Sequence, residues 1–307
     1  MPSPPSVSVV IPVKDGARYL SEVLDAVAAQ RVEHDVLVID SGSVDGSVAI
    51  ARAAGARVHE IAPAAFGHGR TRNLAAGLTT GEVIAFLTQD ATPLPGWLPA
   101  LLEGFALDAR VGAVYGPHRP RPGTPPMVAR DLEQFFARMS PAGDPVVQGA
   151  GGDPYLANVN AAYRRSCWEA VGFRDIAYAE DQAFGHDMLA AGWLKVFQPQ
   201  AAVLHAHDYG TLGFMRRHFD EARGLREATG HVETISPRAT LGGIRRLVGR
   251  DVRWMREQRL PVGQQLRWTA RSVAHHGGRK VFAWLGSRAC ALPARVRRAL
   301  SLERRAD

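Results

Sequence analysis

The first hundred residues alternate short apolar runs with segments in which apolar residues recur at helical spacing. Four short runs, rich in β-branched residues, predict buried strands: Val7–Val13, Val36–Asp40, Arg57–Ile61 and Val83–Leu87. Three segments between them have helical spacing: Tyr19–Gln30, Ser47–Ala54 and Arg70–Gly77. Repeated strand–helix–strand units of this length predict an α/β fold with a mostly parallel sheet flanked by helices.

Proline and glycine interrupt this pattern in the middle of the chain. The proline-rich residues 117–126 predict a loop or lid, and Ser140–Tyr155 predict a second irregular segment. From Phe214 onward the spacing is helical again and arginine is frequent. We therefore expect two domains, an α/β domain over residues 1–210 and a helical basic C-terminal region over residues 211–307.

The composition is that of a globular protein, with 46% hydrophobic and 22% charged residues among 307. No stretch approaches the roughly 20 apolar residues that cross a bilayer. The first residues lack the basic start and apolar run of a secretion signal. Two cysteines, Cys167 and Cys290, are too few for a disulfide framework or a cysteine zinc site. These observations predict a cytoplasmic protein in a reducing compartment.

Charge is unevenly distributed along the chain. Residues 211–307 hold 21 Lys/Arg against 8 Asp/Glu, a net charge of +13, whereas the preceding 210 residues hold 16 against 22, a net charge of −6. A basic region of this kind is typical of contact with phospholipid or nucleic acid, but a solvated cationic surface explains it equally well. Because no nucleic-acid-binding module pattern is evident, we expect no nucleic-acid partner.

Several polar residues follow predicted strands, where α/β proteins bind ligands. Asp40 and Asp90 each end or follow a strand, and each also suits a turn. The pair Glu180–Asp181 opens a helical stretch, where it serves either as a cap or as a general base. His205 and His207 follow an apolar run and are candidate metal ligands or polar groups at a strand end.

The order of these motifs resembles glycosyltransferase family 2, whose members have the GT-A fold and whose inverting enzymes use nucleotide sugars. The segments that carry the resemblance are VSVVIPVKDGARYL, VLVIDSGSVDGS, the region around Asp90, and Glu180–Asp181. A narrower resemblance, to the rhamnosyltransferase-like branch, lies in FGHGRTRN, FLTQDATP, AEDQAFGHDMLAAG and VLHAHDYGTLGFMRRHFD. The match runs in order from about Val7 to Asp220.

The resemblance implies a role for each motif. Asp181 would be the catalytic base, with Glu180 beside it, and a divalent cation (Mg²⁺ or Mn²⁺) would lie on Asp90 with His205 or His207. The implied nucleotide-sugar-binding residues are Pro12, Val13, Lys14, Asp15, Asp40, Ser41, Gly42, Gly69, Arg70, Arg72, Asn73, Gln89 and Asp90. Where many relatives have Asp-x-Asp, this chain has Thr88-Gln89-Asp90, so one carboxylate is missing.

The resemblance further implies transfer of L-rhamnose from dTDP-L-rhamnose onto a cell-surface glycan or a lipid-linked acceptor. A relative that uses a UDP- or GDP-hexose is the alternative within the family, and a catalytically silent, membrane-docking relative is the alternative outside enzymes. The basic tail carries Trp254, Trp268 and Trp284 among its arginines, which predicts peripheral binding to the inner face of the cytoplasmic membrane. The sequence leaves open whether the protein is a homo-oligomer.

Overall fold

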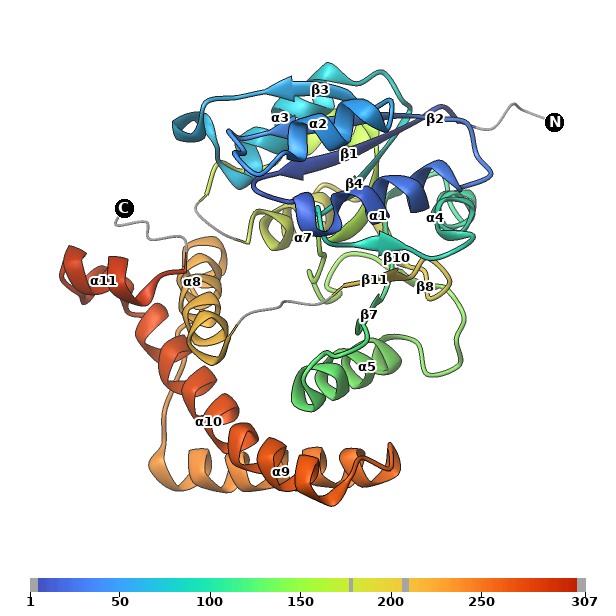
Figure 1. The fold of residues 1–307 in the computed structure, drawn as a ribbon. Helices are drawn as coiled ribbons and strands as arrows, with labels where there is room; N and C mark the ends of the chain where they lie inside the picture. The colour runs from blue at the N-terminus through green and yellow to red at the C-terminus, as the bar shows by residue number, and fades with distance from the viewer. Residues whose placement is uncertain (1–4, 177–178, 206–209, 303–307) are drawn as a thin grey trace. The chain divides into compact units, whose positions relative to one another are not determined.

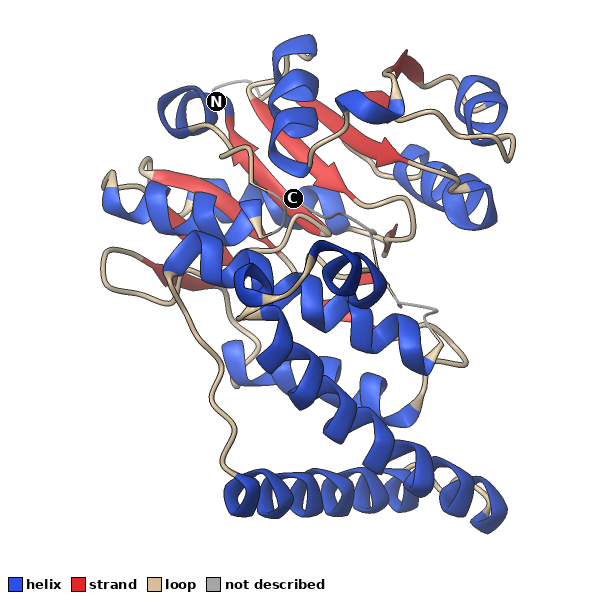
Figure 2. Cartoon of the chain, turned by 90° about the vertical axis from the view of Figure 1, so that its left-hand side faces the viewer, coloured by secondary structure: helices blue, strands red, loops and turns tan. Residues whose placement is uncertain are grey.

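The computed structural model describes residues 5–176, 179–205 and 210–302. The chain divides into two compact units, one of residues 1–121 with 133–206 and the other of residues 122–132 with 207–307. Figure 1 follows the chain through its elements, and Figure 2 shows the strands in red. Among the described residues, every strand belongs to the first unit. The segment Pro122–Leu132, which falls within the predicted domain of residues 1–210, groups with the second unit.

The main sheet of the first unit has eight strands in the described residues, in the order β3-β2-β1-β4-β9-β6-β10-β8. Its parallel half consists of β1 (Val7–Val13), β2 (His34–Asp40), β3 (Arg57–Glu60) and β4 (Val83–Leu87). Its other half consists of β6 (Val111–Tyr115), β8 (Val146–Gln148), β9 (Asn160–Arg164) and β10 (Leu194–Phe197). Strand β9 runs antiparallel to both β4 and β6, so the sheet is mixed in its second half.

A second, small sheet gathers three chain segments that leave the main sheet. It has the order β5-β11-β7, with β5 (Thr92–Pro93), β7 (His118–Arg119) and β11 (Val203–Leu204). These segments follow β4, β6 and β10 in the chain. The small sheet therefore brings together residues that lie more than a hundred positions apart in the sequence.

The helices of the first unit connect these strands. They are α1 (Ala17–Ala28), α2 (Ser47–Ala53), α3 (His68–Leu78), α4 (Trp97–Ala106), α6 (Arg165–Val171) and α7 (Glu180–Ala190), with a short 3₁₀ turn at Pro63–Ala65. The predicted helices are found within one or two residues of their expected ends. Helix α5 (Pro126–Met139) begins in the residues of the second unit and ends in those of the first.

The second unit is helical, as the sequence predicts. It holds α8 (Thr211–Thr229), α9 (Pro237–Glu257), α10 (Val262–Gly286), a 3₁₀ turn (Ala289–Ala291) and α11 (Ala294–Leu300). Phe219 and Met255 are fully buried in it. In the part of the chain that the structure describes, no helix combines the length and apolarity needed to cross a membrane.

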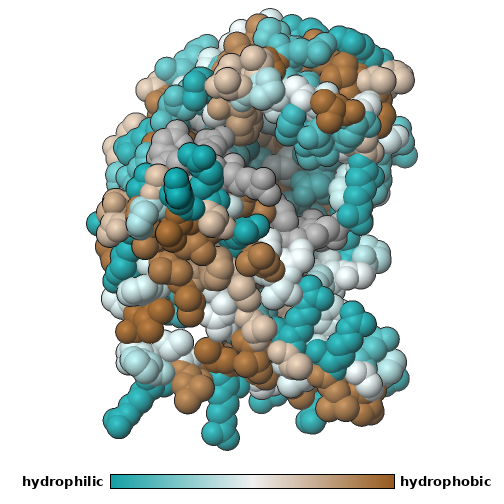
Figure 3. All heavy atoms as spheres, turned by 60° about the vertical axis from the view of Figure 1, so that its left-hand side comes forward, coloured by the Kyte–Doolittle hydropathy of each residue, from teal (hydrophilic) through white to brown (hydrophobic). Residues whose placement is uncertain are grey.

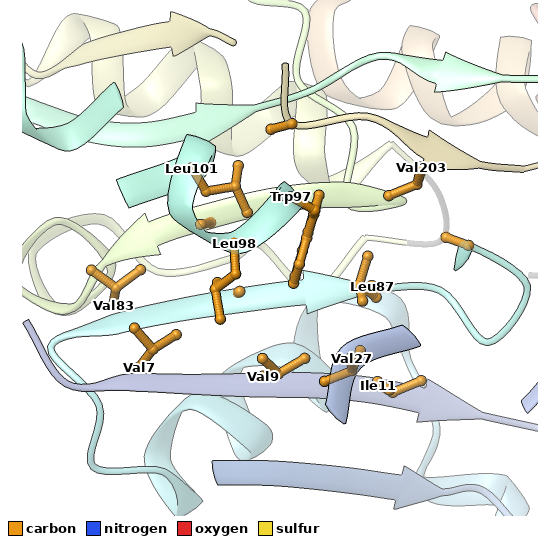
Figure 4. Close-up of a cluster of buried hydrophobic side chains, with 14 of the residues drawn as sticks. Val7, Val9, Ile11, Val27, Val83, Leu87, Trp97, Leu98, Leu101 and Val203 are labelled. Carbon is orange, nitrogen blue, oxygen red and sulfur yellow. The ribbon is translucent and has the colours of Figure 1, made fainter. Parts of the chain in front are cut away.

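The apolar core of the first unit lies between the main sheet and its helices. Figure 4 shows Trp97, Leu98 and Leu101 of α4 over the side chains of β1 and β4. The Trp97 Nε1–H donates to Asn160 Oδ1 at 2.6 Å, and Asn160 Nδ2 donates to Ala201 O at 2.7 Å. This pairing removes the cost of burying two polar groups. The packed sheet gives the loops at its carboxyl edge a rigid base.

Candidate active site

Asp40 ends β2 directly opposite Val13, the last residue of β1. Its side chain is buried, and Oδ1 accepts hydrogen bonds from the backbone N–H groups of Gly42 and Ser43, both at 2.9 Å. Its second oxygen, Oδ2, is buried and has no hydrogen-bond partner among the described residues. A buried acceptor without a partner is costly, and a ligand N–H or O–H at this position would satisfy it.

The loops after β1 and β2 are joined by hydrogen bonds. Asp15 N donates to Ser43 Oγ and Val44 N donates to Asp15 Oδ1, both at 2.8 Å. The Lys14 ammonium donates to Gly42 O, and Ser41 Oγ donates to Val13 O. Asp15 and Gly42 have positive φ angles of 49° and 85°, which make these tight turns possible. Together with Pro12, which is half-buried, these residues form one continuous edge beside Asp40.

Gln89 fastens this edge to the turn after β4. Its Oε1 accepts a hydrogen bond from Lys14 N at 2.7 Å, and its Nε2 donates to Lys14 O at 3.0 Å. An amide side chain has both a donor and an acceptor, whereas a carboxylate only accepts. The two hydrogen bonds to the Lys14 backbone therefore need an amide at position 89, the middle residue of Thr88-Gln89-Asp90.

Asp90 and His205 are brought together from β4 and β11. Asp90 Oδ2 lies 3.3 Å from His205 Nε2, and the backbone N–H of His205 donates to Arg119 O at 2.8 Å. Burial alone would raise the pKa of Asp90, but the charge and hydrogen bond of His205 outweigh it and hold that pKa at about 2. Asp90 is therefore ionised at neutral pH. His207 lies outside the described residues.

Arg121 supports the turn that carries Asp90, although no motif in the sequence predicts this role. Its Nη2 donates to Asp90 O at 3.1 Å and to the Thr92 hydroxyl, and its Nη1 pairs with Glu22 at 2.8 Å. The guanidinium also lies over the ring of Tyr19. The only signal in the sequence is an arginine within a proline-rich segment, which does not indicate its partners.

The acidic pair opens α7 after a strained residue. Ala179 has φ 64°, an uncommon conformation for a residue with a side chain, and such strain is often found at functional sites. Glu180 is buried and pairs with Arg72, with 2.8 Å between Oε1 and Nη1. Burial disfavours the charged form, but the Arg72 guanidinium holds the pKa of Glu180 below its usual value. Glu180 is thus a buried, ionised partner of Arg72.

Asp181 is held in place by backbone donors. Its Oδ2 accepts from Asn158 N at 3.1 Å and its Oδ1 accepts from Gln182 N at 2.8 Å. Burial, followed by the negative charge of Glu180, raises the pKa of Asp181 to about 7. A carboxylate with this pKa is suited to accept a proton near neutral pH.

Asn158 orders both members of the acidic pair, although no motif in the sequence predicts this role. Besides its backbone bond to Asp181, its Nδ2 donates to Glu180 Oε1 at 2.9 Å, and its Oδ1 accepts from the Tyr163 hydroxyl at 2.6 Å. The neighbouring Val159 accepts a hydrogen bond from Thr88 N at 3.3 Å. The segment that holds Asp181 is therefore bonded to the segment that ends in Asp90.

The predicted donor-binding residues of α3 have protein partners in the structure. Asn73 is bonded to the backbone of Phe173 and to the Trp168 indole, and Arg70 pairs with Asp175 at 3.4 Å. At Gly69, a side-chain carbon would lie 2.0 Å from Arg174 O, so only glycine fits. These contacts fix α3 against residues 168–175. Contact of these residues with a donor remains a prediction.

A pocket of about 480 Å³ borders the His205 side of the site. It is lined mainly by apolar and aromatic groups, among them Pro117, His118, Phe136 and Phe197. Arg119 and Glu133 add one cation and one carboxylate to its wall. The His118 ring packs edge-on against the ring of His205, with centroids 5.4 Å apart. The pocket and the Asp90–His205 pair therefore share a wall.

This arrangement of strand-end carboxylates on a mixed sheet is that of a nucleotide-sugar glycosyltransferase with the GT-A fold. Residues 8–172 match glycosyl transferase family 2, and the chain belongs to that family. It is 31% identical over 221 residues to the O-antigen chain rhamnosyltransferase RfbN of Salmonella typhimurium, covering 70% of each chain. It is 30% identical to the O-antigen chain rhamnosyltransferase WbaN of Salmonella anatum, covering 70% of this chain and 71% of the relative.

Solved structures share the fold at lower sequence identity. The mannosyltransferase PcManGT of Pyrobaculum calidifontis, in complex with GDP-mannose and Mn²⁺, has a TM-score of 0.62 at 18% identity and covers 93% of this chain and 88% of its own. Glucosyl-3-phosphoglycerate synthase of Mycobacterium tuberculosis has a TM-score of 0.52 at 21% identity, covering 75% and 82%. The predicted GT-A fold, family and rhamnosyltransferase-like branch are confirmed, and the protein is a glycosyltransferase.

Proposed function

We propose that this glycosyltransferase moves L-rhamnose from dTDP-L-rhamnose to an acceptor hydroxyl with inversion at the anomeric carbon. The mechanism rests on Asp181, because its carboxyl group has a raised pKa. The segment that holds Asp181 is also hydrogen-bonded to the turn that carries Asp90. The two relatives named above as rhamnosyltransferases support the choice of sugar.

Asp40 would bind the donor base. Its buried, unpartnered Oδ2 accepts a hydrogen bond from a ring N–H, which thymine and uracil both carry. Lys14, Asp15, Ser41 and Gly42 form the edge along which the rest of the nucleotide would lie. This geometry supports a pyrimidine nucleotide. Because thymine and uracil both carry the ring N–H, discrimination between dTDP and UDP donors would come from contacts to the sugar and from the groups around Asp90.

Asp90 and His205 have the chemistry of a divalent-cation site. An ionised carboxylate and an imidazole supply the oxygen and nitrogen ligands that Mn²⁺ and similar ions accept. The chemistry that such a cation supplies when bound is neutralisation of the negative charge on the leaving diphosphate. Gln89 contributes by holding the Lys14 loop against this turn, and Arg121 by fixing the backbone of Asp90.

Asp181 would take the proton from the acceptor hydroxyl as that oxygen attacks the anomeric carbon. Asn158 and Gln182 hold the carboxylate in one orientation through backbone donors, which keeps its remaining lone pairs for the proton. Glu180 raises the basicity of Asp181 through its charge, and Arg72 keeps Glu180 ionised. Glu180 thus acts through Asp181 rather than on the substrate.

The donor assignment is tested by melting the purified protein with equal concentrations of several nucleotide sugars. A donor at about 100 times its dissociation constant adds roughly 2.7 kcal/mol of stability, so the best donor gives the largest shift. We expect dTDP-L-rhamnose to give that shift, and Asp40→Asn to abolish it because the amide N–H₂ would face the ring N–H. Glu33→Gln, at an exposed carboxylate, is the control. A larger shift with a UDP- or GDP-sugar would overturn the assignment.

The pocket beside His205 would receive the acceptor glycan. Aromatic walls with few polar groups suit the apolar faces and hydroxyls of a sugar. Arg119, exposed at the pocket, is expected to contact the acceptor, so Arg119→Ala should raise the acceptor KM and leave donor hydrolysis unchanged. Equal acceptor KM values for the variant and the wild type would remove Arg119 from the acceptor site.

The basic helical unit would bind the anionic inner face of the cytoplasmic membrane. Val262, Leu266 and Val273 are exposed and lie on one face of α10 by their spacing of four and seven. The guanidinium groups of Arg267 and Arg271 both lie over the indole ring of Trp268, and that of Arg288 lies over Trp284. At the bottom of Figure 3, where Figure 1 shows α9, apolar and hydrophilic side chains lie next to one another on the surface. Exposed apolar side chains among arginines suit a lipid interface.

Co-sedimentation with vesicles tests this membrane contact. The full chain should sediment with vesicles rich in anionic lipid at low salt, less at high salt, and not with neutral vesicles. Leu266→Glu should weaken binding, whereas Leu107→Glu, at another exposed apolar residue in the first unit, should not. Equal sedimentation of the two variants would show that the α10 face does not enter the membrane.

A further inference from the structure

Two adjacent histidines of α10 and one aspartate of α5 form a cluster inside the second unit. One ligand atom from each of His275, His276 and Asp131 lies within 4.8 Å of the other two. Both histidine side chains are buried, with 6% and 2% of their surfaces exposed, and Asp131 is half-buried. None of the three belongs to the transferase site described above, although Asp131 lies within the residues 8–172 that match the family.

The hydrogen bonds of His276 prepare its other nitrogen to bind a metal. His276 Nε2 lies 2.7 Å from Asp251 Oδ2, a buried carboxylate that also accepts from the Ser272 hydroxyl and pairs with Arg130 at 2.9 Å. Because a carboxylate only accepts, the hydrogen of a neutral His276 ring lies on Nε2 and the lone pair on Nδ1. That Nδ1 is buried without a hydrogen-bond partner among the described residues. Metal-ligating histidines commonly have this second bond to a carboxylate.

His275 supplies a second nitrogen of the same kind. Its Nε2 is buried and has no hydrogen-bond partner in the described part of the chain. Its ring stacks on Phe214 with centroids 4.0 Å apart, and it meets His276 edge-on at 4.9 Å. Burying two imidazole nitrogens without hydrogen-bond partners costs free energy, and a bound cation would remove that cost.

Asp131 is the ligand with competing partners. Arg130 Nη2 lies 2.6 Å from its Oδ1, and Arg279 Nη1 lies 3.3 Å from its Oδ2. The Arg279 side chain is 37% exposed, so it has room to turn toward solvent and release that oxygen. A cation would therefore bind in competition with Arg279, while the Arg130 contact to Oδ1 stays in place.

We propose that His275 Nε2, His276 Nδ1 and Asp131 Oδ2 form a Zn²⁺ site with a fourth position open to water. Two imidazoles and one carboxylate favour zinc over the oxygen-preferring Mg²⁺ and Ca²⁺. Ligand atoms around a tetrahedral zinc lie about 3.3 Å apart, so ligand atoms that are now within 4.8 Å of one another would have to move closer by up to about 1.5 Å. Bound zinc would join α5 to α10 and stabilise the second unit.

Zinc titration of the full-length, chelator-treated protein tests the proposal, with Asp90→Ala as the parent so that the donor site does not contribute. The parent should bind one zinc ion per chain and melt several degrees higher with zinc. Adding His275→Phe, which keeps the stack on Phe214, should weaken zinc binding by at least about 10-fold. Ser272→Ala touches the same Asp251 but supplies no ligand, and it should keep one zinc per chain.

Asp131→Asn provides a second variant in case His275→Phe does not fold, since Asp131 is half-buried and the amide keeps its shape. Asp131→Asn should also weaken zinc binding. A separate readout is cobalt in place of zinc, which should give the visible absorption of a tetrahedral site only in proteins that retain all three ligands. The proposal is overturned if the Asp90→Ala parent binds no zinc saturably, or if its His275→Phe and Asp131→Asn derivatives bind zinc as tightly as it does. Neither result bears on the transferase chemistry, because the measurement is made without donor.

Discussion

Arg72 forms a buried ion pair, 2.8 Å from Nη1 to Oε1, with Glu180, the residue that immediately precedes Asp181 in the chain. The guanidinium keeps Glu180 ionised, and the charge of Glu180, added to burial, raises the pKa of Asp181. The arginine therefore acts on the proposed base through an intermediate carboxylate.

Replacement of Asp181 tests the proposed base. Asp181→Asn keeps the size of the side chain but removes the proton acceptor, and loss of a general base typically lowers the rate by about 10²–10⁴. The variant should still bind donor, as judged by the same thermal shift as the wild type. Transfer at near wild-type rate would remove Asp181 from the mechanism.

The pH dependence of transfer tests the influence of Glu180. For the wild type, kcat should rise with pH through about 7, because Asp181 must lose its proton to act as a base and its pKa is raised to that value. Glu180→Gln removes the negative neighbour, so the pKa of Asp181 falls and the rising limb of the profile moves to lower pH. Glu169→Gln, at an exposed glutamate, should leave the profile in place. An unshifted profile in Glu180→Gln would contradict the coupling.

Removal of Asp90 tests the cation site. Asp90→Ala should weaken metal-dependent donor binding strongly, because it removes the carboxylate that His205 keeps ionised. His205→Ala should have a smaller effect in the same direction, and Glu33→Ala should have none. If a chelator leaves wild-type activity unchanged and Asp90→Ala remains active, the leaving diphosphate is stabilised by other groups and the cation hypothesis is wrong.

Gln89→Glu tests the amide that fastens the Lys14 loop. The variant keeps its reach to Lys14 N but cannot donate to Lys14 O, and loss of one hydrogen bond costs about 1 kcal/mol of stability. We expect a corresponding decrease in the free energy of unfolding in urea and weaker donor binding. Stability and donor affinity equal to the wild type would show that the amide is not structurally required.

Local pattern was enough to predict the parallel half of the sheet. Val7–Val13 and Val83–Leu87 have the bounds found in the structure, because each is a short buried run that ends where a polar loop begins. Strand β9, Asn160–Arg164, was not predicted as a strand. Its place between β4 and β6 depends on pairing with residues that lie about fifty to eighty positions away, which no local window contains.

The same limit applies to the site. Asp40, Asp90 and Asp181 stand at recognisable positions in motifs, whereas Asn158 and Arg121 act through partners from distant segments. The sequence also gave no indication that Arg72 pairs with Glu180, or that Gln89 binds the Lys14 backbone. Side chains whose role is to hold other residues have no signature of their own in the sequence.

An inverting transfer that depends on Asp181 is tested most directly by the anomeric configuration of the released sugar. The purified protein is given dTDP-L-rhamnose with water as the acceptor, and NMR records which anomer of rhamnose forms first. Attack from the face opposite the diphosphate predicts a first-formed rhamnose of inverted configuration, produced by the wild type and nearly absent with Asp181→Asn. Release with retained configuration, or equal release by the variant, would contradict an inverting transfer that depends on Asp181.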